Sequence, residues 1–432
     1  MKTTTLTLLL LTTLSLHAEQ SAEPDSARAA LSLAEVTRAV LAANPSIREA
    51  QRKWDAAKER VTQEKAWPDL TVRAGSVAAR FVNVAPNGFT DQTLTLEQSV
   101  PISGKNRSRA RIAAADAVVA FEEARRAELD VVAQARSAYF RLADAYAQIE
   151  LNQRNHTSLA QIAEISRSRY EFGTQNAADT LMAETEAAKL LEVRRDLERN
   201  VADAQTQLNV LMNRDAFAAV GRPAELSPPM AHLPVDHLRT LTLQNRPEVR
   251  SALARIAGEQ ARLQLAHRAW IPDPAISAQG QRYNDTGQAV SEVGAGISFS
   301  IPWGNYRKYS AGVYEAELSL DSSQAALERS RSEAIGALRE ALQKAETAHH
   351  HLELFRTNLV PQARQTFVAS QLAYESGKAS FGEWIAAQRA QRDLEAEARE
   401  HVADYQIALA ELERVVGGDL HLFPIATIPT NK

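Results

Sequence analysis

The sequence predicts a mainly α-helical fold with a small amount of β-sheet, arranged as two tandem repeats of helix, β-hairpin, long helix and helix. Three observations support this prediction: short motifs recur in the same order in both halves, one very long segment lacks glycine and proline, and the composition suits close helix packing. Of the 432 residues, 45% are hydrophobic, only 6% are aromatic and 24% are charged. Such a composition favours long helices packed side by side.

Four short motifs recur in the same order in the two halves of the chain, offset by 201 to 204 positions. Four collinear matches are hard to obtain by chance, so an internal repeat is predicted. The matched segments are 44–48 with 246–250, 66–69 with 269–273, 99–102 with 300–303, and 170–173 with 374–377. We therefore expect a first repeat at 19–218, a proline-rich linker at 219–235, a second repeat at 236–418 and a tail at 419–432.

Residues 1–18 have the features of a secretory signal peptide, namely a basic residue at Lys2, an apolar run over 6–16 and a small residue, Ala18, at the expected cleavage point. A buried N-terminal helix is the alternative interpretation. The sequence contains no cysteine, so neither disulfides nor a lipid-modified cysteine are expected. The net charge of −4 argues against a nucleic-acid partner. No later segment approaches the ~18 consecutive apolar residues of a membrane helix.

Each half begins with a predicted helix, 31–65 in the first and 235–267 in the second, and Pro68 and Pro272 end these helices. Two extended runs follow in each half. They lie at 70–82 and 90–100 around a turn at 86–88, and at 275–283 and 292–301 around a turn at 284–287. Turns of Asn, Asp and Gly between such runs predict β-hairpins.

The second strand of each hairpin alternates between apolar and polar residues. The apolar rows are Leu94, Leu96 and Val100 in the first half, and Val293, Ala295, Ile297, Phe299 and Ile301 in the second. Gln98 interrupts the first row. Strands of about ten residues with one apolar face are typical of the wall of an outer-membrane β-barrel. Two soluble hairpins that cap a helical bundle are the alternative.

Two hairpins supply four strands, which are too few to close a barrel. An open sheet leaves unpaired backbone groups at its edges, and lipid does not tolerate such edges. The sequence therefore predicts that several chains pool their strands. The hairpins are flanked by aromatic residues, as at a membrane interface: Trp67, Phe89, Trp270, Tyr283 and Trp303.

The segment 105–172 contains neither glycine nor proline, and as a single helix it would reach roughly 100 Å. Its apolar residues keep near-heptad spacing, which suits coiled-coil packing. The equivalent segment, 305–376, contains Pro361, so a bend is expected there. Each long helix is followed by a glycine and a return helix, 177–212 or 380–416. The two predicted helical hairpins therefore have their tips at Gly173 and Gly377.

Taken with these elements, the tip motifs resemble those of the TolC-type outer-membrane efflux factor family. The tip signature is an aromatic residue, two further residues and glycine, followed six residues later by a carboxylate. It occurs as 170–173 with Asp179 and as 374–377 with Glu383. The segments 98–107 and 409–417 are similar to the heavy-metal, CzcC-like branch.

The resemblance implies a homotrimer in the outer membrane, with a twelve-strand β-barrel continued by a twelve-helix α-barrel in the periplasm. It also implies an exit duct that docks to a periplasmic adaptor protein and an inner-membrane pump of the RND type. Metal cations are one expected cargo, and a drug or protein-export channel is the alternative. A soluble periplasmic coiled-coil adaptor is the alternative of another class, but it would need one helical hairpin and more β-structure.

The resemblance places a periplasmic gate at three residues: Asp179, Tyr374 and Glu383. It places the adaptor contact at the tips, on Phe172, Gly173, Thr174, Ser376, Gly377 and Lys378. The chain departs from the family pattern at Ala379, where a basic residue is expected. The alternative for both acidic gate residues is that they favour the N-terminus of a helix without gating.

No catalytic or cofactor-binding pattern occurs in the sequence, so we expect a protein that is not an enzyme and has no cofactor. Gly294 and Gly296 lack the third glycine and the helix of a nucleotide-binding loop. The run 349–351 is three histidines, which point roughly 100° apart on a helix. A solvated helix face is therefore preferred to a metal site.

Overall fold

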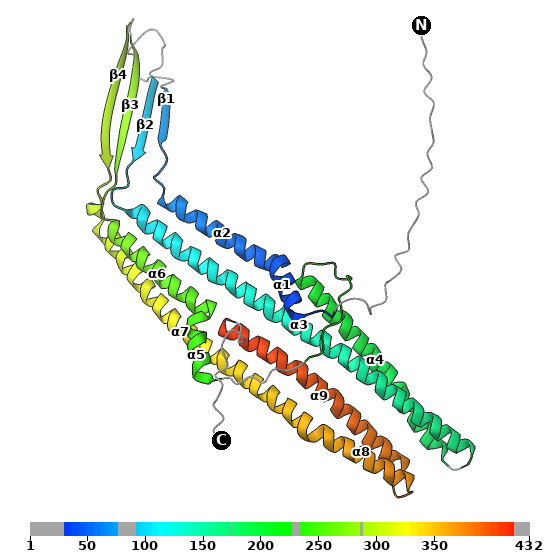
Figure 1. Cartoon of the computed structure of the whole chain (residues 1–432). Helices are drawn as coiled ribbons and strands as arrows, with labels where there is room; N and C mark the ends of the chain where they lie inside the picture. Colours follow the sequence, from blue (N-terminus) through cyan, green and yellow to red (C-terminus); the bar gives the residue numbers. More distant parts are fainter. Residues whose placement is uncertain (1–29, 77–91, 174, 227–233, 286–287, 419–432) are drawn as a thin grey trace, which may run out of the picture.

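The computed structural model describes residues 30–76, 92–173, 175–226, 234–285 and 288–418. The molecule is elongated, with a small β-sheet at one end and two helical hairpin tips at the other (Figure 1). The first half contains α1 (Leu33–Ala43), α2 (Pro45–Lys65), β1 (Thr71–Ser76), β2 (Gln92–Ser99), α3 (Lys105–Glu171) and α4 (Ala177–Leu211). The second half contains α5 (Val235–Asn245), α6 (Pro247–Arg268), β3 (Pro274–Asp285), β4 (Gln288–Phe299), η2 (Pro302–Asn305), α7 (Tyr306–Leu354), η3 (Phe355–Leu359), α8 (Val360–Glu375) and α9 (Phe381–Val416). The same order in both halves confirms the two tandem repeats.

The first helix of each half is broken, so the prediction of one continuous helix was wrong in both places. The breaks fall before Pro45 and Pro247, which begin α2 and α6. Asn44 and Arg246 have extended backbone there, with ψ near 126° and 124°. A proline disfavours helical conformation in the residue before it. The Asn44 side chain compensates by accepting a hydrogen bond from the Ser46 N–H at 2.9 Å.

The four strands form one antiparallel sheet in the order β1-β2-β3-β4. The register aligns Val72, Leu96, Ala278 and Ala295 across the sheet, and the neighbouring row begins Thr71, Glu97 and Ser277. Because side chains alternate along a strand, one face is apolar and the other is polar. The apolar face carries Val72, Ala74, Leu94, Leu96, Ile276, Ala278, Val293, Ala295, Ile297 and Phe299.

The apolar face of this sheet is open to the surroundings. Val293 and Ile297 are 90% and 71% exposed. The predicted exception in the row, Gln98, turns its amide to donate a hydrogen bond to the Pro68 carbonyl at 2.8 Å. The turn predicted at 86–88 lies outside the described residues, as do Phe89 and the side chain of Tyr283. Of the turn predicted at 284–287, residues 284–285 belong to β3 instead, and 286–287 lie outside the described residues.

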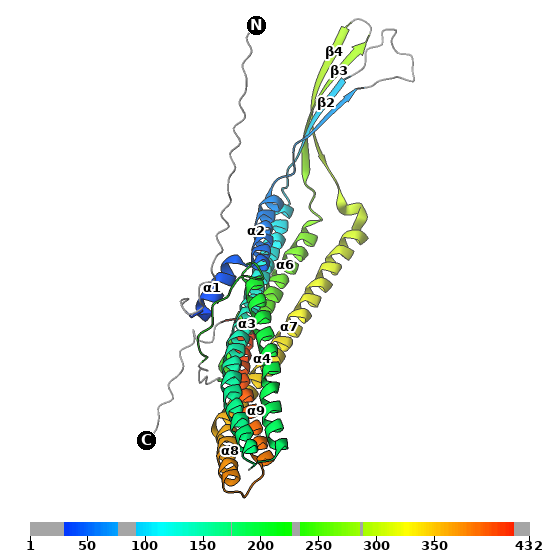
Figure 2. The ribbon, with the colours of Figure 1, turned by 90° about the vertical axis from the view of Figure 1, so that its right-hand side faces the viewer.

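The long helix of the first half is confirmed as α3, a single helix of 67 residues. It lies next to α2 and α6 on the sheet side, and next to α4 and α9 toward the tips (Figures 1 and 2). Alanine lines much of its buried face, including Ala113, Ala124, Ala135 and Ala138. Such small side chains allow helices to approach closely, in agreement with the composition.

The corresponding helix of the second half is interrupted close to the predicted position. Residues Phe355–Leu359 form a π-helical turn just before Pro361. Proline has no N–H to bond the carbonyl four residues earlier, which here belongs to Thr357. The π-helix is rare and occurs mostly as a single turn inside an α-helix, as it does here. Among the described residues, no helix is long and apolar enough to cross a membrane.

The largest apolar core lies at the waist, the level at which α4, α5 and α9 end (Figure 1). It joins α1, α3 and α4 through residues such as Val40, Tyr139, Leu142 and Leu208. A second cluster near the tips contains Leu159, Ile162, Ala183, Leu190, Phe381 and Ile385. Because this cluster draws on α3, α4 and α9, it joins the two helical hairpins to each other.

Candidate functional site at the hairpin tips

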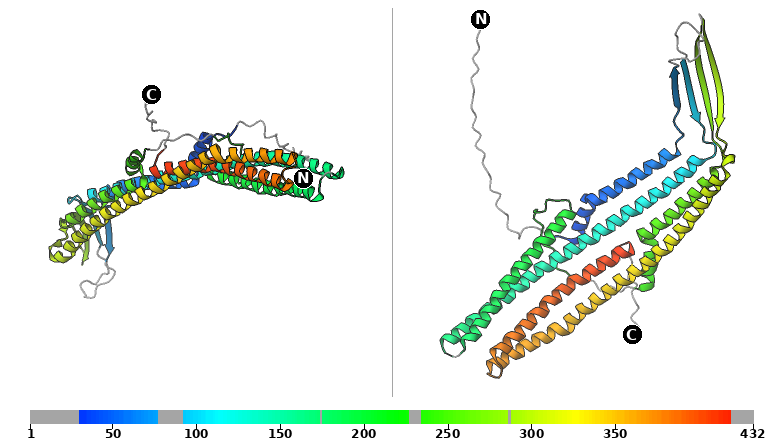
Figure 3. Two further views of the ribbon diagram at one scale, coloured as in Figure 1. Left: turned by 90° about the horizontal axis from the view of Figure 1, so that it is seen from below. Right: turned by 180° about the vertical axis from the view of Figure 1, so that it is seen from behind.

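The two hairpin tips lie side by side at the end of the molecule farthest from the sheet (Figures 1 and 3). The first tip joins α3 to α4 at Gly173 and the second joins α8 to α9 at Gly377. Both glycines have left-handed backbone, with φ of 71° and 72°. Residues other than glycine rarely adopt this conformation, so the two tips turn in the same way.

Most of the predicted adaptor-contact residues lie on the tip surface. Phe172 is 81% exposed, which is unusual for a large apolar side chain. The residues Ser376, Gly377 and Lys378 are also exposed. Thr174 lies outside the described residues. The tips therefore present the exposed rings of Tyr170 and Phe172, together with Lys378, for contact with another molecule.

Tyr374 is at the centre of an aromatic cluster within the second hairpin. Its ring stacks on Trp384, with centroids 5.2 Å apart and an angle of 15°, and meets Phe381 edge-on at 5.5 Å. Its hydroxyl also accepts a hydrogen bond from Nη1 of Arg169 in the first hairpin, at 3.4 Å. The predicted gate tyrosine thus links the two hairpins within one chain.

Asp179 lies in the first turn of α4, which Asn176 caps by accepting a hydrogen bond from the Ala178 N–H at 3.2 Å. The Asp179 side chain is half-buried. Within the part of the chain that the structure describes, its carboxylate has no hydrogen-bond partner. The structure therefore does not bring Asp179 and Tyr374 together in one chain.

Glu383 takes part in a capping box at the start of α9. Its carboxylate accepts a hydrogen bond from the Ser380 N–H at 2.7 Å, and its own N–H donates to Ser380 Oγ at 3.2 Å. This reciprocal arrangement satisfies two N–H groups at the helix start. The geometry therefore favours the alternative of a helix N-terminal acid for Glu383, and its role in gating stays a prediction.

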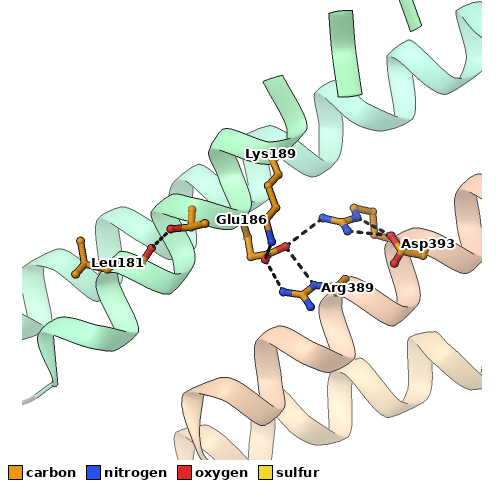
Figure 4. Close-up of polar contacts among 7 residues, drawn as sticks. Leu181, Glu186, Lys189, Arg389 and Asp393 are labelled. Atoms are coloured by element: carbon orange, nitrogen blue, oxygen red, sulfur yellow. Dashed lines mark hydrogen bonds and ion pairs between the residues drawn. The ribbon is translucent and has the colours of Figure 1, made fainter. Parts of the chain in front are cut away.

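An ion cluster near the tips joins α4 to α9 and was not predicted from the sequence (Figure 4). At its centre is Glu186 on α4, whose side chain is only 4% exposed. Arg389 on α9 donates from Nε to Glu186 Oε2 at 3.2 Å and from Nη2 to Oε1. Lys189 Nζ lies 2.8 Å from Oε1, and Arg392 Nη1 lies 3.7 Å from Oε2. One buried carboxylate is thus held by three cations.

The charge state of Glu186 follows from these contacts. Burial alone would raise its pKa, but hydrogen bonds from Lys189 and Arg389 outweigh burial and hold the pKa below the ordinary value. Arg392 also forms an ion pair with Asp393 at 2.9 Å. The cluster is therefore ionised at neutral pH and connects the first hairpin to the second by charge.

At the waist, further ion pairs join α3 to α9. Arg136 pairs with Glu413, whose side chain is 9% exposed. Arg414 Nη1 lies 3.0 Å from Asp130 Oδ1. Together with the apolar core, these pairs fix the waist end of α9 against α3.

The three histidines lie on α7, close to α9. His350 and His351 are exposed, as predicted, whereas His349 is half-buried with its ring 5.2 Å from the ring of Tyr405. His351 lies 5.3 Å from His401, ring to ring. The described ranges contain no group of three or more His, Asp or Glu residues placed to hold a metal ion.

Comparison with curated proteins gives distant relatives that span most of the chain. The chain is 24% identical over 364 residues to the probable efflux pump outer membrane protein SepC of Pseudomonas putida. This alignment covers 81% of this chain and 74% of SepC. The chain is also 22% identical over 302 residues to the cobalt-zinc-cadmium resistance protein CzcC of Cupriavidus metallidurans. That alignment covers 69% of this chain and 71% of CzcC.

Solved structures share the fold over nearly the whole chain. CusC superposes with a TM-score of 0.78 at 16% identity, covering 90% of this chain and 92% of that chain. The outer-membrane channel OprN superposes with a TM-score of 0.76 at 17% identity, covering 90% of each chain. The sequence model described as outer membrane efflux protein matches residues 36–214 and 238–418. The chain therefore belongs to the outer membrane efflux protein family.

Proposed function

We propose that this protein is the outer-membrane channel of a tripartite efflux system, an exit duct that passively conducts substrate received from a pump and an adaptor. The observation that carries this proposal is the amphipathic sheet at one end of a long helical body. The exposed row that includes Val293 and Ile297 matches a lipid-facing wall, and the polar row behind it matches a wet interior. No catalytic step is part of this role.

The same sheet supports a homotrimer. Among the strands that the structure describes, β1 and β4 lie at the two edges of the sheet, and each has one side without a partner strand. Lipid requires a closed ring of strands. Three chains would supply twelve strands, as the family resemblance implies, and their helices would continue the barrel into the periplasm. Outer-membrane lipid is then a direct contact of the apolar face.

The length of the helical body supports docking to periplasmic partners. At 1.5 Å per residue, the 67 residues of α3 span roughly 100 Å. The tips would thus meet an adaptor protein, with Phe172, Gly173, Thr174, Ser376, Gly377 and Lys378 as the contact residues. The pump that completes the system is proposed to be of the RND type.

A gate at the tips is part of the proposal, with Asp179, Tyr374 and Glu383 as its residues. In a trimer, three copies of each carboxylate around the axis would concentrate negative potential and favour cations. Replacing both Asp179 and Glu383 by alanine is expected to raise single-channel conductance in planar bilayers. An unchanged, closed channel would refute the gate.

Two classes of cargo are compatible with the relatives. Their names include cobalt-zinc-cadmium resistance for CzcC and toluene efflux for TtgF of Pseudomonas putida. We propose metal cations as the cargo, because two metal-resistance proteins are among the relatives and the segments 98–107 and 409–417 are similar to that branch. A deletion strain should become sensitive to cobalt, zinc or cadmium, and sensitivity to toluene alone would refute a metal cargo.

The channel proposal is tested by membrane fractionation followed by native mass measurement of the purified protein. The expected result is an outer-membrane fraction that yields a homotrimer and conducts ions in planar bilayers. A soluble monomer would overturn the proposal and would favour a periplasmic adaptor protein.

A further inference from the structure

We propose that His351 on α7 and His401 on α9 form a binding site for a divalent transition-metal ion of the Ni²⁺, Cu²⁺ and Zn²⁺ class. The two rings lie 5.3 Å apart, centre to centre, on the second helical hairpin. Imidazole nitrogen is a preferred ligand of these metals. The site belongs to the wall of the helical body and not to the predicted gate. It goes beyond the proposed function and does not rest on the choice of cargo.

The distance between the two rings fits shared coordination of one ion. Imidazole nitrogen binds such metals at about 2.1 Å, commonly in tetrahedral geometry. Two imidazoles that share a tetrahedral ion at this distance have ring centres roughly 5 Å apart. The planes of the His351 and His401 rings are tilted by 55°, so the rings are not stacked. Two aromatic rings also pack at such distances, and the surroundings of the pair decide between the two roles.

The surroundings of His401 hold its ring and leave one nitrogen for a metal. Its Nδ1 atom lies 3.7 Å from Oδ2 of Asp404, about one turn along α9. A carboxylate beside one ring nitrogen is typical of metal-binding histidines, because it orients the ring and raises the basicity of the other nitrogen. The Phe355 ring meets the His401 ring edge-on at 4.5 Å, and the His401 side chain is only 20% exposed. The nitrogen left for a ligand bond is therefore Nε2.

His351 supplies the second ligand and the route from solvent. It is exposed, so an ion can reach the pair without any opening of the fold. Its neighbours in the histidine run are directed elsewhere. His349 is half-buried beside Tyr405, with the two rings 5.2 Å apart, and His350 is exposed and points roughly 100° away around α7. The run therefore contributes one ligand, and the other ligand comes from a different helix.

The charges around the pair favour a cation. The carboxylate of Asp404, beside His401, also interacts with Asp144 on α3, as does Glu400. Arg399 is the nearby cation. Burial and the charge of Glu400 raise the pKa of Asp144 to about 6. Such an excess of carboxylates creates a negative potential that raises the local concentration of cations.

The remaining ligands of the ion are water molecules, because no third His, Asp or Glu among the described residues is placed to complete a metal site. Affinity should therefore follow the order of imidazole complexes, with Cu²⁺ above Ni²⁺ and Ni²⁺ above Co²⁺. Mg²⁺ prefers oxygen ligands and should not bind. The ion would join α7 to α9 beside the π turn of Phe355–Leu359, so binding should raise Tm.

The test is Ni²⁺ binding to the full-length protein, purified in detergent without a histidine tag and followed by titration calorimetry and by Tm. His351→Ala and His401→Ala should each abolish the binding heat and the rise in Tm with Ni²⁺. Asp404→Asn should weaken binding about tenfold, because it removes only the carboxylate beside the ring. His350→Ala is the matched control, since it removes an adjacent exposed histidine, and it should bind Ni²⁺ as the wild type does.

The outcomes separate this site from other histidines of the chain. If the wild type takes up no Ni²⁺, the proposal is overturned. Binding that survives both His351→Ala and His401→Ala would place the ion elsewhere and would also overturn it. Equal losses in His350→Ala and His351→Ala would assign binding to the histidine run and refute the pair. If His401→Ala does not fold, the exposed His351→Ala decides by the same two measurements.

Discussion

Glu186 on α4 and Arg389 on α9 lie 203 positions apart in the sequence and form a two-point ion pair between the two hairpins. Lys189 on α4 and Arg392 on α9 also approach the Glu186 carboxylate. The acid of this cluster therefore comes from the first hairpin, and two of its three cations come from the second.

A stability effect is expected at this pair. Glu186→Gln should lower the free energy of unfolding at pH 7 by about 2–3 kcal/mol, less than for a fully buried pair because Arg389 is partly exposed. The folded-state pKa of Glu186 is depressed, so its contribution is present above the ordinary pKa and is lost as the pH falls through the folded value. The difference in Tm between variant and wild type should therefore shrink in acid. A difference that is constant with pH would contradict this.

A second prediction concerns Asp144, whose pKa is raised to about 6. Between its ordinary pKa and this value the folded state holds more protons than the unfolded state, so stability falls as the pH rises. Above pH 6 the cost is complete, at about 2–3 kcal/mol. Asp144→Asn should raise Tm at pH 8 and have little effect at pH 4. Asp321→Asn, at an exposed position of α7, serves as the control and should change Tm at neither pH.

A third prediction concerns the junction between sheet and helices. The Asp273 carboxylate accepts hydrogen bonds from the Ser103 N–H and hydroxyl, both at 2.9 Å, and from Lys105 Nζ at 3.1 Å. Asp273→Ala should therefore cost about 2–3 kcal/mol of unfolding free energy. The motif places Asp69 at the equivalent position of the first repeat, where it is exposed. Asp69→Ala should be nearly neutral in urea unfolding, and equal effects of the two changes would contradict this reading.

Local sequence signals were sufficient for most of the fold. The absence of glycine and proline over 105–172 identified α3, and period-two alternation identified the apolar face of β2 and β4. The breaks in the first helices also have a local signal, because proline is favoured in the first turn of a helix and Pro45 and Pro247 begin α2 and α6. The apolar spacing continues across both breaks, so it predicts one continuous helix in each half. The motif that marks the repeat therefore also marks the helix break.

The tip region was only partly predictable, because contacts between distant segments decide it. The aromatic and glycine signature located both tips, but Arg169 and Trp384, the partners of Tyr374, have no local signal. The cluster around Glu186 has no local signal either, because Glu186 and Arg389 lie 203 positions apart in the sequence. The local sequence does contain one signal for the start of α9, the Ser380 and Glu383 pair, whose spacing is that of a capping box.

The last prediction separates the two roles of Glu383. A capping box accepts glutamine in place of glutamate, whereas an electrostatic gate requires the charge. Glu383→Gln should therefore leave Tm unchanged, and Glu383→Ala should lower the unfolding free energy by about 1 kcal/mol. If Glu383 also gates, Glu383→Gln alone should change the conductance and cation preference in planar bilayers. If conductance responds to neither substitution while Tm responds only to alanine, the capping hydrogen bonds with Ser380 are the whole role of this residue.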